Sequence, residues 1–184
     1  MKRSHVATKL DLEAFARDGA SLTGEWPATD LPRLVESGAP DHPAAQWPAV
    51  RWSLQGELRQ PRAAAAQIWL HLQAQAELDL TCQRCLQAYR QPLHVDRWLR
   101  FVNEESEAAA LDVDSDDDVL ALERHLDAQA LVEDELLLAL PIVPRHEVCP
   151  QPLVAANTEP ADAEPIRPNP FAALAALKPS PGKD

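Results

Sequence analysis

Two pairs of residues with the spacing of metal ligands stand out in the sequence. Cys82 and Cys85 are separated by two residues, and so are His146 and Cys149. Thiolate and imidazole groups are the usual ligands of structural zinc, which binds four of them in a tetrahedron. The first pair follows a long alternating pattern and is expected at a β-hairpin turn, where two thiolates converge on one ion. The sequence therefore predicts a structural zinc site formed by Cys82, Cys85, His146 and Cys149.

The residues themselves leave two other uses of these side chains open. In one, the thiols pack inside the turn and His146 lies in solvent. In the other, Cys82 and Cys85 are a thiol oxidoreductase pair, but such a motif belongs at a helix N-terminus beside a βαβ unit, and this one follows a strand. A disulfide framework is disfavoured because the chain has three cysteines, an odd number.

Patterns that would indicate an enzyme are missing from the sequence. It has no G-x-S-x-G motif and no glycine-rich phosphate loop. The acids Glu133, Asp134 and Glu135 are consecutive, so on a helix they point about 100° apart and cannot share one site. We expect them on the solvent face of that helix, or with one acid packed near an arginine of the sheet. We expect His71 and His94 to be exposed or hydrogen-bonded. The prediction is a non-enzymatic protein without a small-molecule substrate.

Three segments in the middle of the chain alternate between apolar and polar residues. They are residues 50–58, 66–82 and 93–102. A strict period of two means that one face of each strand is buried and the other is wet, which is typical of an antiparallel sheet rather than a parallel one. Three such strands in succession predict a meander whose apolar face is covered by helices.

Helical patterns flank these strands. Short ones occur near residues 11–17 and 28–38, and the strongest one covers 126–140. We therefore predict an α+β fold with one domain over residues 1–149 and a Cys-x-x-Cys at a hairpin turn. Its parts are a helical N-terminal region (1–45), an antiparallel β-meander (48–102), an acidic loop (103–118) and a helix (126–140). The Pro-rich residues 150–184 are predicted to be a flexible tail with a short amphipathic helix near 170–178.

The charge of the chain is concentrated in one segment. The 184 residues carry a formal net charge of −12, and residues 104–135 alone contain 13 acids against one base, Arg124. Such a segment suits a basic protein partner, or it is a solvated loop, and it argues against general binding of nucleic acid. No apolar run is long enough to span a membrane, and the start lacks the apolar core of a signal peptide, so we expect a cytoplasmic protein.

Aromatic and basic residues in the strands leave a small local contact with RNA open, in spite of the acidic charge of the chain. Trp69 and Trp98 occupy polar positions of their strands, near Arg97 and Arg100. Aromatic rings beside arginines can stack on bases or bind a partner. The alternative, which we favour, is that these tryptophans form a second packing layer, because large aromatic side chains are usually buried.

Three strings together resemble a known family. They are Leu80-Thr-Cys-Gln-Arg-Cys-Leu86, the run Leu131-Val-Glu-Asp-Glu-Leu-Leu-Leu-Ala-Leu-Pro-Ile-Val-Pro144, and the tail Arg167-Pro-Asn-Pro-Phe-Ala-Ala-Leu-Ala-Ala-Leu-Lys178. In this order they are similar to the bacterial YceD family, the large ribosomal RNA subunit accumulation proteins. The resemblance implies a non-enzymatic factor needed for synthesis, processing or stability of 23S ribosomal RNA.

From the charge pattern and this resemblance together we predict action through a large-subunit ribosomal protein or assembly intermediate, with a local rRNA contact as an addition. The alternatives are a zinc-stabilised nucleic-acid-binding module and, less favoured, a thiol oxidoreductase. The candidate partner-binding residues are three arginines, the three helix acids and three apolar residues of the tail: Arg84, Arg97, Arg100, Glu133, Asp134, Glu135, Phe171, Leu174 and Leu177.

Overall fold

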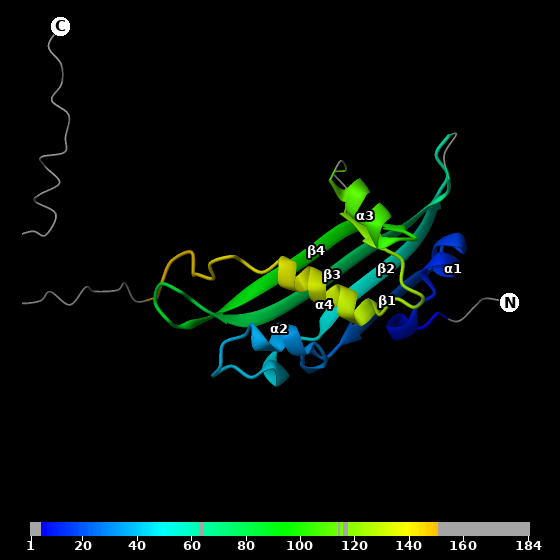
Figure 1. Cartoon of the computed structure of the whole chain (residues 1–184). Coiled ribbons are helices and arrows are strands. Elements are labelled where there is room, and N and C mark those ends of the chain that lie inside the picture. The colour runs from blue at the N-terminus through cyan, green and yellow to red at the C-terminus, as the bar shows by residue number, and fades with distance from the viewer. Residues whose placement is uncertain (1–4, 63–64, 114, 116–117, 151–184) are drawn as a thin grey trace, which may run out of the picture. The chain divides into compact units, whose positions relative to one another are not determined.

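The computed structural model describes residues 5–62, 65–113, 115 and 118–150, and its main feature is one five-stranded sheet (Figure 1). The strands are β1 (Ser21–Trp26), β2 (Val50–Arg59), β3 (Gln67–Thr81), β4 (Ala88–Val102) and β5 (Asp118–Ala121). They lie in the order β1-β2-β3-β4-β5. The first three pairings are antiparallel, and β5 runs parallel to β4. The predicted α+β fold with an antiparallel meander is thus confirmed.

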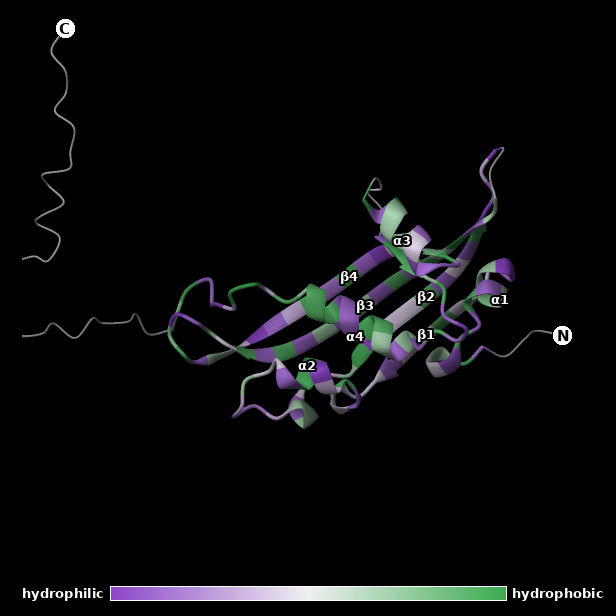
Figure 2. Ribbon diagram, viewed as in Figure 1, coloured by the Kyte–Doolittle hydropathy of each residue, from purple (hydrophilic) through white to green (hydrophobic). Residues whose placement is uncertain are grey.

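The register of the strands explains the alternation in the sequence. Leu54 of β2 lies opposite Leu72 of β3, and Leu70 of β3 lies opposite Leu99 of β4. All four side chains are buried, whereas the residues between them belong to the other face of the sheet. Figure 2 shows this as hydrophilic and hydrophobic bands that succeed one another along β3 and β4. One face is therefore apolar and must be covered.

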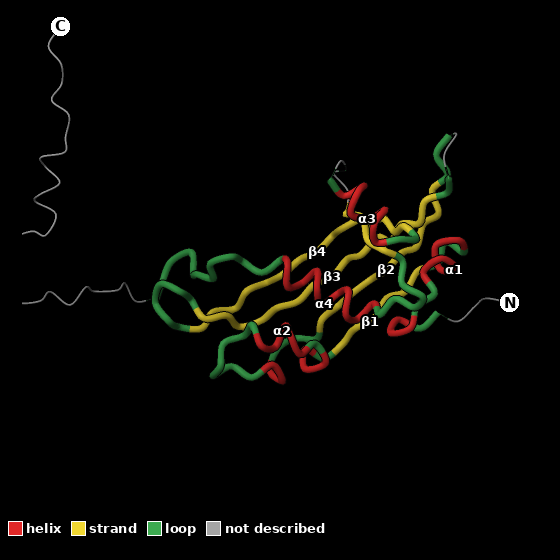
Figure 3. Tube along the Cα trace, in the orientation of Figure 1, coloured by secondary structure: helices red, strands yellow, loops and turns green. Residues whose placement is uncertain are grey.

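Short helices cover the apolar face (Figure 3). They are α1 (Leu12–Arg17), α2 (Pro32–Glu36) and α4 (Ala128–Leu138), with 3₁₀ turns at Ala7–Lys9, Ala28–Asp30 and Ala44–Gln46. Phe15 from α1, Leu34 from α2 and Leu136 from α4 are fully buried and join the strand residues in one hydrophobic cluster. No helix in the described part of the chain is long and apolar enough to cross a membrane.

Two segments differ from the predictions. Residues 1–45, predicted to be helical, contain the edge strand β1, which pairs with β2 from Ser21↔Gln55 to Trp26↔Val50. The acidic segment 103–118, predicted to be a loop, contains helix α3 (Glu105–Asp112) and the first residue of β5. Ala108 of this helix packs on Val102 and Val119 in a second small cluster. Packing on the sheet edge, rather than a long apolar period, stabilises α3.

The acids of α4 do not form the solvent face that the sequence suggested. Glu133 and Glu135 are buried at 4% and 8% exposure, and only Asp134 is exposed. Glu133 accepts hydrogen bonds from the backbone N–H groups of Arg33 and Leu34, at 2.7 and 3.1 Å, and from Arg33 Nε at 3.0 Å. A buried carboxylate is stable there because it satisfies N–H groups at the start of α2.

Glu135 has a different environment. Burial raises the pKa of its carboxyl, although the nearby Arg97 guanidinium opposes that rise. Arg97 occupies a helix-side position of β4, opposite Leu72, and forms an ion pair with Asp118 of β5. The less favoured alternative, an aromatic surface that includes Arg97 beside Trp98, does not hold for Arg97, because adjacent residues of a strand point to opposite faces.

Candidate metal centre and its surroundings

The Cys-x-x-Cys lies in the hairpin turn between β3 and β4, as predicted. The two strands pair as far as Thr81↔Ala88. Beyond that pair, the Cys82 N–H donates to the Gln87 carbonyl at 2.9 Å, and the Leu86 N–H donates to the Cys82 carbonyl at 2.8 Å. Leu86 has a φ of 60°, in the left-handed region that completes a tight turn. The turn therefore holds both thiols at the end of the sheet.

The segment after α4 returns to this hairpin end (Figure 1). The Gln83 N–H donates to the Pro144 carbonyl at 2.8 Å. Arg84 Nη2 donates to the carbonyls of His146 and Glu147, at 3.0 and 3.3 Å. These contacts bring His146 and Cys149 to the two thiols of the turn.

The four predicted ligands form one cluster. Cys82 Sγ, Cys85 Sγ, Cys149 Sγ and a ring nitrogen of His146 all lie within 4.8 Å of one another. Cys82 Sγ and Cys149 Sγ are 3.8 Å apart, and Cys85 Sγ and His146 Nδ1 are 3.4 Å apart. Zinc bonds of about 2.3 Å to sulfur and 2.0–2.1 Å to nitrogen place tetrahedral ligand atoms about 3.6–3.8 Å apart. The cluster therefore fits one tetrahedral zinc ion, and all three cysteines are free thiols.

The polar groups around Cys82 favour its thiolate, whereas burial, together with the neighbouring sulfur atoms of Cys149 and Cys82, raises the pKa of Cys85. Burial raises the pKa of the Cys82 thiol, but hydrogen bonds from the backbone of Cys85, from His146 and from the backbone of Arg84 together lower this pKa to about 5. One of these donors, the His146 N–H, is 3.4 Å from Cys82 Sγ. A thiolate is the form of cysteine that binds a metal.

Arg84 supplies positive charge beside the cluster. Its Nε donates to Cys149 Sγ at 3.0 Å, and this hydrogen bond is the main reason that the pKa of Arg84 is raised. A divalent cation with three thiolates and one neutral imidazole would carry a net charge of −1, which the guanidinium offsets. Arg84 thus has the position of a residue that orients and neutralises ligands.

An ion pair between a buried acid and a partly exposed arginine connects the two strands just before the cluster. Asp79 of β3 accepts two hydrogen bonds from Arg90 of β4, at 2.8 and 3.1 Å. These hydrogen bonds are the first cause of the lowered pKa of Asp79, and His42 contributes at 3.4 Å. The Asp79 carbonyl also accepts from the Ala39 N–H at 2.7 Å. Contacts from β4 and from the segment around Ala39 therefore hold this end of β3 in place.

The candidate partner-binding residues do not form one surface. Arg84 is at the cysteine cluster, Arg97 pairs with Asp118, and Glu133 and Asp134 both bind Arg33. Arg100 is on the other face of the sheet, where its buried Nε has no hydrogen-bond partner among the described residues. Phe171, Leu174 and Leu177 lie outside the described residues, as does the predicted tail helix. Their role in partner binding stays a prediction.

The face of the sheet opposite the helices carries a stack of planar groups. The Arg59 guanidinium lies over the rings of Trp69 and Trp98, with its carbon 4.1 and 4.4 Å from their centroids. The His71 ring stacks on Trp98 at 4.4 Å, and His71 Nε2 is 2.7 Å from Asp96 Oδ1. Trp69 is 5% exposed, so the arginine and its neighbours shield this ring in place of the expected second layer. The sequence pattern did not indicate that Arg59 contacts both rings, because Arg59 belongs to a different strand, β2.

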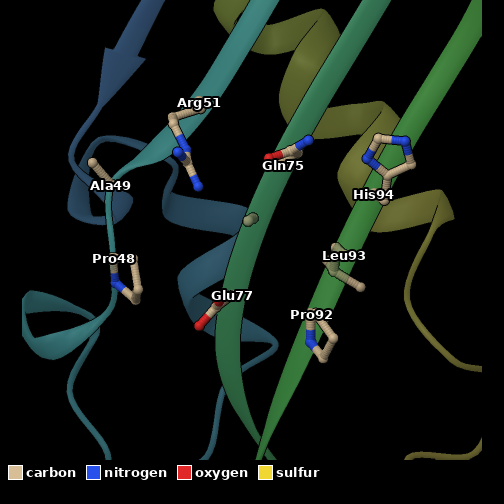
Figure 4. A pocket seen from close by; sticks show the side chains of 9 residues that line it. Pro48, Ala49, Arg51, Gln75, Glu77, Pro92, Leu93 and His94 are labelled. Atoms are coloured by element: carbon tan, nitrogen blue, oxygen red, sulfur yellow. The ribbon is translucent and has the colours of Figure 1, made fainter.

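A shallow hollow continues along this open face (Figure 4). Arg51, Gln75 and His94 project into it from three neighbouring strands, where they are aligned in register. Its volume is about 200 Å³, and Glu77 and Pro92 also line it. The hollow joins one arginine, one acid and neutral polar groups, so its charge is mixed.

Comparison with known proteins decides the family. The sequence model of the YceD family, described as large ribosomal RNA subunit accumulation protein YceD, matches residues 70–178. The chain belongs to the YceD family. The match begins in β3 and includes the cysteine hairpin, α4 and the His146–Cys149 segment.

A curated member of the family gives the same assignment. The large ribosomal RNA subunit accumulation protein YceD of Haemophilus influenzae is 37% identical over 109 residues. This alignment covers 56% of the chain and 62% of the relative, so it spans less than two thirds of the YceD relative's length. No solved structure matches the chain.

Proposed function

We propose that this chain is a non-enzymatic ribosome biogenesis factor that supports the accumulation of large-subunit, 23S ribosomal RNA. The observation that carries the proposal is the match of residues 70–178 to the YceD family. The factor acts through a protein partner on the assembling large subunit. The acidic segment supports a protein partner, because 13 acids against one base in residues 104–135 repel a polyanion and attract a basic protein.

The cysteine cluster binds one structural zinc ion in this proposal. Four protein ligands complete the tetrahedron and leave no open position for a substrate, which is typical of structural rather than catalytic zinc. The ion ties the hairpin of β3 and β4 to the segment that follows α4. It thereby links two parts of the chain that are distant in sequence. Cys82 and Cys149, for example, are 67 positions apart.

A second candidate function is a direct contact with single-stranded RNA on the open face of the sheet. The stack of Trp69, Arg59, Trp98 and His71 favours it, because aromatic and guanidinium planes can stack on bases. The charge of this face does not favour it, since Arg59 is paired with Glu57 and His71 with Asp96. We therefore give this function second place.

Sedimentation tests the proposed site of action. A full-length, tagged protein expressed at its natural level is expected to sediment with large-subunit precursors in a sucrose gradient of cell extract. RNase treatment before the gradient is expected to move the protein to the top. Sedimentation with small-subunit particles, or a position only at the top without RNase, would contradict action on the assembling large subunit.

A further inference from the structure

A groove lies on the helix side of the sheet, between α4 and the edge strand β5. Its floor is apolar and consists mainly of Phe101 from β4, Leu120 from β5 and Leu131 from α4. Figure 1 labels α3, α4 and β4, three of the elements that contribute residues to its lining. The cavity volume is about 420 Å³. This volume is comparable to that of ligand-binding clefts, about 300–1,000 Å³, but the groove is open to solvent along one side.

The rim of this groove is acidic. Glu105, Glu123, Asp127 and Asp134 line it, and no lysine or arginine does. Asp127 caps α4 through the N–H groups of Gln129 and Ala130, and Asp134 binds Arg33. Glu105 and Glu123 are exposed, and within the described ranges neither has an ion-pair partner. We call this feature the acidic groove.

The chemistry of the acidic groove excludes several occupants. A nucleic acid or an acidic peptide would be repelled by the carboxylates of the rim, of which only Asp134 has an ion-pair partner among the described residues. A single metal ion is disfavoured too, because the cysteine cluster is the one group of three or more potential metal ligands gathered in the described part of the chain. The apolar floor calls for an apolar side chain, and the rim calls for cations beside it.

We propose that the acidic groove binds a basic segment of a large-subunit protein, with an apolar side chain on the floor and lysine or arginine side chains at the rim. This inference rests on the proposed function and names the class of partner. Burial of the apolar side chain supplies affinity, at about 25 cal/mol per Å². The rim charges supply orientation and a fast, salt-dependent association.

Peptide binding to the full-length protein tests this proposal. The probes are 15-residue peptides that tile the ribosomal proteins of the large subunit of the source organism. The peptides that bind are expected to combine lysine or arginine with at least one large apolar residue. Their serine-substituted versions, with equal charge and no apolar residue, are expected to bind about tenfold more weakly.

Matched variants locate the binding site. Glu105→Gln with Glu123→Gln is expected to weaken binding about fivefold, as for two exposed charge pairs, whereas Glu36→Gln with Asp41→Asn removes the same charge elsewhere and leaves binding unchanged. Leu131→Gln is expected to weaken binding tenfold or more, whereas Leu138→Gln, at an α4 position that is 75% exposed, has no effect. Equal effects within either pair would overturn the proposal.

Two competing occupants are included as outcomes. Tighter binding of a peptide comprising residues 165–183 of this chain, lost in Leu131→Gln, would assign the acidic groove to the chain's own tail. Binding of single-stranded RNA that is lost in the groove variants would assign it to RNA. Either result overturns the partner proposal.

The failure of this inference and that of the proposed function are distinguishable. A groove variant that fully restores ribosomal RNA in cells lacking the protein would contradict the role of the acidic groove and would leave the proposed function unaffected. Peptide binding that depends on the groove, together with normal ribosomal RNA after loss of the protein, would support the acidic groove and contradict the proposed function.

Discussion

Replacing Cys82 by serine is expected to remove bound zinc and to lower the unfolding midpoint of the full-length protein. Cys82 is fully buried and is one of the four candidate ligands of the cluster. Zinc binds the folded state far better than the unfolded one, so its loss removes about 3 kcal/mol or more of unfolding free energy. For a domain of this size that is a fall of about 6–12 °C. Metal analysis is expected to show about one zinc per wild-type chain and almost none in the variant.

A chelator distinguishes metal loss from the loss of a packed side chain. It is expected to lower the unfolding midpoint of the wild-type protein to near that of Cys82→Ser and to leave the variant unchanged. Gln83→Ser, a substitution in the same turn at a position that is not a ligand, serves as the control and is expected to retain zinc. A wild-type midpoint that the chelator does not move would contradict the structural role of zinc.

Replacing Glu133 by alanine is expected to have the second large effect, a loss of about 3 kcal/mol of unfolding free energy. The carboxylate accepts from two backbone N–H groups at the start of α2 and from Arg33 Nε, and it is 4% exposed. Its removal leaves these N–H groups without an acceptor inside the protein, and hydrogen bonds to a charged group contribute about 1.5–3 kcal/mol each. Chemical denaturation measured by circular dichroism checks this expectation.

The neighbouring acid provides the control. Asp134 binds the same arginine, but its side chain is 51% exposed. Asp134→Ala is therefore expected to cost less than 1 kcal/mol, as is typical of an exposed ion pair. Glu133→Gln keeps the shape and one acceptor oxygen and should fall between the two. Equal losses in Glu133→Ala and Asp134→Ala would show that the buried carboxylate does not hold α2 against α4.

The parts of the fold that follow a local period could be predicted. The alternation of residues 50–58 and 66–82 predicts which side chains are buried, and Leu54, Leu70 and Leu72 are indeed buried. The cysteine pair at the end of that alternation indicated a hairpin turn. The spacing of His146 and Cys149 then indicated the two remaining candidate ligands, and the structure brings all four side chains together.

The parts that depend on distant partners could not be predicted in the same way. Glu133 and Arg33 are 100 residues apart, and no local pattern shows that this carboxylate is buried. The edge strand β1 is short and exists because β2 offers it hydrogen bonds. β5 pairs in parallel with β4, which a segment of only four residues cannot reveal.

One error could have been avoided. Arg97 occupies the same alternating positions as Leu93, Val95 and Leu99, so the pattern itself places it on the helix side. Its proximity in sequence to Trp98 was misleading. The acidic segment was predicted to be a solvated loop because it has no apolar period of its own. Its helix α3 is stabilised by packing on the sheet edge, which a local pattern does not show.

The most direct test of the proposed function is the ratio of large-subunit to small-subunit ribosomal RNA in the source organism after depletion of this protein. The ratio is expected to fall within a few generations, while re-expression of the wild-type chain restores it. Depletion of an unrelated factor to the same growth rate controls for slow growth. An unchanged ratio in cells fully depleted of the protein would contradict a role in the accumulation of large-subunit ribosomal RNA.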